Sequence, residues 1–284
     1  MTSQMPEIKD SDILVKIADL FRLRSGWKIA GRDWVKFHSC VMQRIALLKL
    51  DKMSSYYQKL VLPQPKLSDE FCNLASLMVN SESYFFRDKG QQAALQNHIF
   101  PTLIKAKSAS KQLKIWSAGC STGEEAYSLA MMLSFILPNW REWKLTILGT
   151  DLNGDSIKKA EKGEYRENSM RDVDIVDKNR FFTKVDKTWH VLPTYQPMVK
   201  FQQGNLVEDQ FPSLISEFQN MDLIVCRNVF IYFNQEAITR VVQKFAKTLQ
   251  RGGILMLGHG EAQVDETWGL KGELLPGALI YKKM

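Results

Sequence analysis

The chain has 284 residues, of which 45% are hydrophobic and 24% are charged, and it carries a formal net charge of +7. This composition indicates a soluble globular protein, and it excludes a membrane-spanning helix because no apolar run approaches the roughly 18 residues that such a helix needs. The N-terminus lacks an apolar signal segment, and the four cysteines are scattered without a Cys-x-x-Cys pair. We therefore expect a cytoplasmic protein without a metal centre.

The first part of the chain has the pattern of helices. Between Trp34 and Leu48, apolar residues recur at intervals of three or four, which gives a helix one apolar face. We expect residues 1–75 to form a small helical domain. Residues 76–112 would then form a linker and a lid segment over a ligand site.

Positive charge is concentrated in this helical part. Between Arg22 and Lys49, basic residues greatly outnumber acidic ones, and Arg32, Lys36 and Arg44 fall on a slowly drifting stripe of the predicted helix. Such a stripe suits an acidic partner, which can be nucleic acid, anionic lipid or an acidic protein surface. An ordinary solvated helix face is the alternative interpretation.

From Leu113 onward, apolar strands and amphipathic helices alternate. The first unit is a strand over 113–116, a small-residue turn over 119–123 and a helix. Further strands are expected at 145–151, 222–226 and 253–257, with an amphipathic helix after Asn234. This alternation predicts an α/β fold with a mostly parallel sheet and helices on both faces.

A charged stretch at about 161–202 interrupts the alternation. It contains short extended runs at 189–192 and 198–201. We expect it to form an inserted subdomain with a small antiparallel sheet.

The turn after the first strand is a candidate ligand site. It lacks the second glycine of a dinucleotide-binding Gly-x-Gly-x-x-Gly motif, since Ser121 stands there, and no phosphate-binding lysine follows Gly123. Glu124 and Glu125 stand where a phosphate would bind. These residues favour a ligand without phosphates, and S-adenosylmethionine fits; an ordinary strand-to-helix loop is the alternative.

Polar residues are expected around the carboxyl ends of the strands, where ligands bind in this architecture. Asp151 suits a ribose diol or, alternatively, caps the next helix. Arg227 and Asn228 follow another strand, and Tyr232 comes shortly after them; it is a site residue or a core tyrosine. Arg87 suits a carboxylate or, alternatively, a surface ion pair.

These motifs together resemble those of the CheR-type chemotaxis receptor methyltransferases, which form glutamate methyl esters on chemoreceptors from S-adenosylmethionine. The resemblance covers essentially the whole chain. It is carried by the segments Ser81–Asp88, Trp116–Ser128, Thr150–Asn153, Gly204–Leu206, Cys226–Phe233 and Gly258–Glu261.

The resemblance implies a Rossmann-like class I methyltransferase domain at 113–284, a site for S-adenosylmethionine, and roles for particular residues. The cofactor would be held by Ser81, Ser83, Arg87, Glu125, Asp151, Asn205, Leu206, Arg227 and Asn228. Arg87 and Tyr232 would lie closest to the transferred methyl group. The partner would be the cytoplasmic helical bundle of a chemoreceptor in a receptor array, met by the basic stripe; no nucleic acid and no membrane insertion are implied.

Two departures from the family pattern stand out. Ser81 replaces the usual asparagine. Residues 166–202 contain no glycine, although some members bind a receptor C-terminal pentapeptide through a glycine-rich loop of the inserted subdomain. We therefore expect an enzyme that does not depend on pentapeptide tethering. By default, we take it to be a monomer. The alternatives are a methyltransferase with another substrate and a non-catalytic, cofactor-binding regulator.

Overall fold

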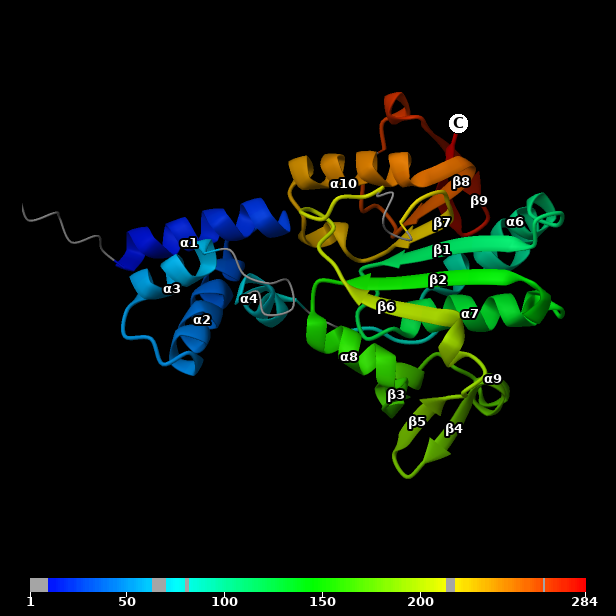
Figure 1. The fold of residues 1–284 in the computed structure, drawn as a ribbon, viewed down its shortest axis with the longest axis horizontal. Coiled ribbons are helices and arrows are strands. Elements are labelled where there is room, and N and C mark those ends of the chain that lie inside the picture. The colour runs from blue at the N-terminus through cyan, green and yellow to red at the C-terminus, as the bar shows by residue number, and fades with distance from the viewer. Residues whose placement is uncertain (1–9, 63–69, 80–81, 213–217, 263) are drawn as a thin grey trace, which may run out of the picture.

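The computed structural model describes residues 10–62, 70–79, 82–212, 218–262 and 264–284, except for the side chain of Arg32. A helical N-terminal part lies beside a larger α/β part that is built on one twisted sheet (Figure 1). None of the described helices is long and apolar enough to cross a membrane.

Among the described residues, the N-terminal part contains the helices α1 (Asp10–Ser25), α2 (Arg32–Leu47), α3 (Met53–Val61) and α4 (Glu70–Met78). Each buries one apolar face in a common core, in which Phe21 of α1 contacts Phe37 of α2 and Phe71 of α4 at ring distances of 5.2 and 5.5 Å. This arrangement follows the helical spacing of the apolar residues. The last helix ends at Met78, slightly beyond the expected boundary at residue 75.

Arg44 does not lie on an exposed basic stripe, so this part of the docking prediction is wrong. Its guanidinium forms two 2.7 Å contacts with the carboxylate of Glu70, which also accepts a 2.9 Å hydrogen bond from the Tyr56 hydroxyl. The side chains of Arg44 and Glu70 are only 13% and 3% exposed. Arg44 therefore neutralises a buried acid that would be costly to leave alone.

The large sheet has seven strands in the order β6-β2-β1-β7-β8-β10-β9. Their bounds are β1 (Gln112–Ala118), β2 (Lys144–Asp151), β6 (Val199–Gln203), β7 (Met221–Cys226), β8 (Leu249–Leu257), β9 (Leu270–Leu275) and β10 (Ala278–Lys283). The first five pair in parallel, and β9 and β10 are antiparallel additions at one edge. The α/β prediction is thus confirmed.

Helices cover both faces of this sheet. One face packs against α5 (Lys89–Ala94), η2 (Leu95–Ile99), α6 (Phe100–Ala106) and α7 (Glu124–Ile136), and the other against α10 (Gln235–Thr248). Neighbouring residues of β1 face opposite sides, since Ile115 belongs to the first core and Trp116 to the second. The helix α8 (Gly154–Lys162) follows β2, and short helical turns occur at η3 (Trp140–Glu142), η5 (Gln196–Met198), η6 (Phe230–Tyr232) and η7 (Glu266–Trp268).

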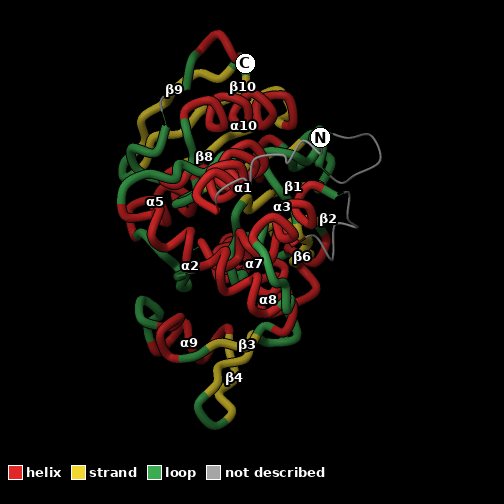
Figure 2. The backbone as a smooth tube through the Cα atoms, turned by 90° about the vertical axis from the view of Figure 1, so that its left-hand side faces the viewer, coloured by secondary structure: helices red, strands yellow, loops and turns green. Residues whose placement is uncertain are grey.

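The inserted subdomain is smaller than expected. It contains the antiparallel sheet β3-β5-β4, with β3 (Glu164–Tyr165), β4 (Phe182–Val185) and β5 (Thr188–Val191), together with η4 (Glu167–Met170) and α9 (Ile175–Phe181). It projects from the body at the end opposite α10 (Figure 2). The run at 198–201 is not part of it: β6 pairs in parallel with β2, from Ile147–Val199 to Asp151–Gln203, and forms the edge of the large sheet.

A short backbone joint, residues 26–28 paired with residues 232–234, connects the helical and α/β parts. The Lys28 N–H donates to the Tyr232 carbonyl at 2.8 Å, and the Asn234 N–H donates to the Gly26 carbonyl at 2.7 Å. Gly26 has φ +71°, and a Cβ atom there would lie 2.4 Å from the Ala237 Cβ. Only glycine at position 26 allows the two backbone segments to approach this closely.

Candidate active site

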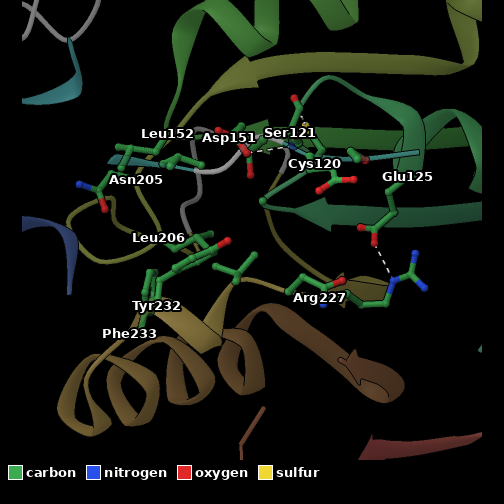
Figure 3. A pocket seen from close by; sticks show the side chains of 18 of the residues that line it. Cys120, Ser121, Glu125, Asp151, Leu152, Asn205, Leu206, Arg227, Tyr232 and Phe233 are labelled. Atoms are coloured by element: carbon green, nitrogen blue, oxygen red, sulfur yellow. Dashed lines mark hydrogen bonds and ion pairs between the residues drawn. The ribbon is translucent and has the colours of Figure 1, made fainter. Parts of the chain in front are cut away.

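A pocket opens where β1, β2 and β7 end, at the point where the strand order reverses (Figure 3). Most of the residues proposed for the site line it together: Ser83, Arg87, Glu125, Asp151, Asn205, Leu206, Arg227, Asn228 and Tyr232. Ser81 lies outside the described residues. The pocket also includes residues that the sequence did not single out, notably Trp27, Leu152 and Phe233.

The turn after β1 brings the backbone close to the loop that follows β7. A Cβ atom on Gly119 would lie 2.3 Å from Val229 Cγ2, so this position admits only glycine. Of the two acids that follow the turn, only Glu125 lines the pocket. Glu124 is buried elsewhere and accepts hydrogen bonds from the hydroxyls of Thr122 and Ser169, at 2.7 and 2.9 Å. Glu125, which is the one of the two acids named for the cofactor site, is therefore the one that faces the pocket.

Asp151 is held at the end of β2 by backbone N–H groups. Its Oδ2 accepts from Ser121 at 2.9 Å and its Oδ1 accepts from Asn153 at 2.8 Å. Burial raises the pKa of this carboxyl group, and the two N–H donors oppose the rise. The cap of α8 is Asn153, whose side chain accepts from the first residues of that helix. Each Asp151 oxygen retains acceptor capacity, which suits a diol.

Glu125 and Arg227 form a nearly buried ion pair across the pocket (Figure 3), with 2.7 Å between Oε2 and Nε. Their side chains are 13% and 8% exposed. Arg227 also donates to the carbonyl of Arg87 and to the side chain of Gln91, at 2.9 and 3.1 Å. The ion pair and the two hydrogen bonds of Arg227 therefore connect α7, the loop after β7, and the start of α5 with the segment before it. Sequence reasoning missed Gln91, a buried amide whose only signal is its polarity.

Arg87 is placed differently from Arg227. No described carboxylate pairs with its guanidinium, which lies 5.5 Å from the centre of the Tyr84 ring. Its positive charge acts on the Tyr232 hydroxyl: burial raises the pKa of Tyr232, and Arg87 opposes that rise. The ring of Tyr232 stacks on Trp27 from the helical part, with 4.8 Å between centroids and 28° between planes. A guanidinium without a described acidic partner and a phenol therefore line the same pocket.

Asn205 and Leu206 lie in the loop that follows β6. The Asn205 side chain is largely used in building the loop, because its Oδ1 accepts from Val207 N–H at 2.9 Å and its Nδ2 donates to the Arg24 carbonyl at 3.0 Å. The ammonium of Lys244 on α10 donates to the carbonyls of Leu206, Val207 and Asp209, at 3.3, 2.7 and 2.9 Å.

A second cavity lies beside the pocket and shares Trp27 and Tyr232 with it. Lys28 and Lys36 are among its lining residues. The Lys36 ammonium donates to the Met78 carbonyl at 2.7 Å. Of the three proposed docking residues, only Lys36 is placed next to the site, since Arg44 is internal and the Arg32 side chain is not described.

The pocket suits S-adenosylmethionine. Asp151 offers a carboxylate to a diol, and Leu152, Leu206 and Phe233 offer apolar contact. Arg87, which has no acidic partner among the described residues, offers a cation to a carboxylate. Within the described ranges, no group of His, Cys, Asp and Glu residues could hold a metal ion.

Comparison with known proteins identifies the family. The sequence model described as "CheR methyltransferase, SAM binding domain" matches residues 81–271. A chemotaxis protein methyltransferase from Listeria monocytogenes is 37% identical over 195 residues, 69% of each chain, and one from Pseudomonas aeruginosa is 36% identical over 190 residues, 65% of this chain and 67% of that protein. A third, from Vibrio cholerae, is 26% identical over 256 residues, 90% of this chain and 86% of that protein. The chain therefore belongs to the CheR methyltransferase family, and its cofactor is S-adenosylmethionine.

Proposed function

We propose that this enzyme methylates glutamate carboxylates on the cytoplasmic helical bundle of a chemoreceptor, and that it works in the cytoplasm at receptor arrays. The observation that carries the proposal is that Arg87, which has no described carboxylate partner, lines the same pocket as Tyr232. The charge of Arg87 also opposes the rise that burial causes in the pKa of Tyr232. A negatively charged acceptor fits this pocket. The names of the related chemotaxis protein methyltransferases support the same substrate class.

The chemistry needs positioning more than proton transfer. S-adenosylmethionine supplies an electrophilic methyl group when bound. A glutamate side chain with a pKa of about 4.3 is already ionised near pH 7, so no general base is required. Arg87 would orient a carboxylate, and Tyr232, whose pKa burial raises, would remain a neutral hydrogen-bond donor. Trp27 and Phe233 would limit the access of water.

The cavity behind Trp27 and Tyr232 suggests how the acceptor approaches. Lys28 and Lys36 lie on this side of the site, where positive charge would attract a glutamate-rich helical surface. The hairpin between β4 and β5 turns through Asp186, at φ +53°, without a glycine. This feature supports the proposal that the enzyme does not use a pentapeptide tether; tight binding of a receptor C-terminal pentapeptide would contradict it.

The first test is transfer of radiolabelled methyl groups to membranes that contain the organism's own chemoreceptors. We expect label on a receptor band that mild base releases as methanol, which identifies a carboxyl ester. Base-stable label would indicate another acceptor group, and cofactor binding without any label would favour a non-catalytic regulator. Arg87→Ala and Tyr232→Phe should each slow transfer, by at least about tenfold, in folded protein.

Docking is tested by charge reversal. Lys28→Glu together with Lys36→Glu should slow methylation and flatten its dependence on salt, because screening acts on an attraction that these variants remove. Lys16→Glu on the exposed side of α1 is the matched control and should change neither quantity. Unaltered salt dependence in the double variant would contradict docking through this cavity.

A further inference from the structure

Trp27 is the point at which the helical part enters the active site. Its side chain is 6% exposed and belongs to the core of the helical part, where it contacts the ring of Phe21 at 6.1 Å. The same indole lines the cofactor pocket and stacks on the Tyr232 ring. One face of the side chain is thus fixed by the helical core, and another contacts a residue of the reaction site.

The backbone on both sides of this contact is also fixed. Trp27 and Phe233 form an antiparallel bridge, and the two hydrogen bonds of the joint flank the Trp27–Tyr232 stack. Arg24 and Glu208 add a 2.8 Å ion pair between the two parts. Tyr232 itself ends the short turn η6, whose three residues provide little rigidity of their own. The helical part therefore contributes contacts that hold both the backbone and the ring of Tyr232.

We propose that Trp27 is a positioning residue that fixes the Tyr232 ring, and with it the phenol hydroxyl, at the reacting end of the pocket. The inference rests on the proposed function, because it requires Tyr232 to act on the acceptor or the methyl group. It assigns the helical part a role in catalysis that is separate from docking the substrate. The stacked geometry explains the choice of side chain, since a flat indole restricts both the tilt and the translation of a facing ring.

The test compares Trp27→Leu, Trp27→Phe and Tyr232→Phe, singly and combined, by measuring kcat, the cofactor KM and the thermal midpoint. Trp27→Leu should lower kcat by about tenfold or more, because small displacements of a catalytic group are costly. Trp27→Phe should recover much of the rate, because a phenyl ring can also stack. In the Tyr232→Phe background, Trp27→Leu should cause little further loss, because its effect passes through the missing hydroxyl.

Trp34→Leu is the matched control. Trp34 packs on the same helical core and contacts Phe37 at 6.2 Å, but it does not line the pocket. It should lower the thermal midpoint without lowering kcat. Unchanged kcat in Trp27→Leu, or an equal loss in both backgrounds, would overturn the positioning role while leaving the proposed function intact. A wild-type kcat in Tyr232→Phe would instead overturn the role of Tyr232 in the proposed function, and the inference with it.

Discussion

Single residues of this site divide into those that hold the pocket together and those that face a ligand. Arg227 and Glu125 belong mainly to the first group, because each neutralises the other at 2.7 Å in a nearly buried position. Asp151 keeps acceptor capacity, and Arg87 has no described acidic partner. The two arginines therefore differ in role although both line the same pocket.

Removing the charge of Glu125 should lower both the stability of the protein and its affinity for the cofactor. We expect Glu125→Gln to lower the free energy of unfolding by about 3 kcal/mol and to weaken cofactor binding, because Arg227 would remain as a nearly buried, unpaired cation. Denaturant titration and binding of S-adenosylhomocysteine measure the two effects. Glu236→Gln is the control, because it breaks an exposed pair with Arg240 that contributes less than about 1 kcal/mol. Equal losses in the two variants would contradict the assigned role of Glu125.

At the scale of elements, one lysine of α10 connects this helix to the loop after β6, part of which lines the cofactor pocket. Lys244 donates to three carbonyls of the loop after β6, and burial lowers the pKa of its ammonium group. These carbonyls belong to a loop that has no regular secondary structure to satisfy them. The lysine therefore fixes the loop that carries Asn205 and Leu206.

We expect Lys244→Met to raise the dissociation constant of S-adenosylhomocysteine several-fold and to cost about 2 kcal/mol of stability, because up to three carbonyls lose their donor. Calorimetric titration and thermal unfolding measure these effects. Lys247→Met, at an exposed position of the same helix, should leave both quantities near wild type. If the two variants behave alike, the loop does not depend on this contact.

The sequence predicted elements well where local pattern decides them. The strand, turn and helix at 113–136 and the position of Asp151 follow from periodicity and from the known place of ligands in such sheets. It failed where distant residues decide. The spacing of Arg44 could not reveal that Glu70 lies opposite, and the five residues of β6 are too short for their pattern to choose between a hairpin and a parallel edge strand. Trp27 carries no local signal, because its partner Tyr232 is far away in the chain.

At the scale of the whole molecule, the helical and α/β parts meet at the joint, where an added Cβ atom on Gly26 would clash with Ala237. We expect Gly26→Ala to lower stability by about 2 kcal/mol more than Gly252→Ala, because only the first adds a clash with Ala237 to the cost of a positive φ. Gly252 has φ +77° and no other group within 4 Å of an added Cβ atom. Thermal unfolding measures the difference. Methyl transfer should fall in the first variant alone, and equal behaviour of the two would show that the joint is more adaptable than its geometry indicates.

The joint also limits which helical parts of related proteins could replace the helical part of this enzyme. A chimaera that took its helical part from another member would replace the surface proposed to face the substrate and, at the same time, part of the wall of the cofactor pocket. The incoming part would need glycine at position 26 and a flat ring at position 27 to match the unchanged segment 232–234. Changes in receptor preference and in turnover are therefore expected to be inherited together in such chimaeras, unless residues 26–28 are kept with the α/β part.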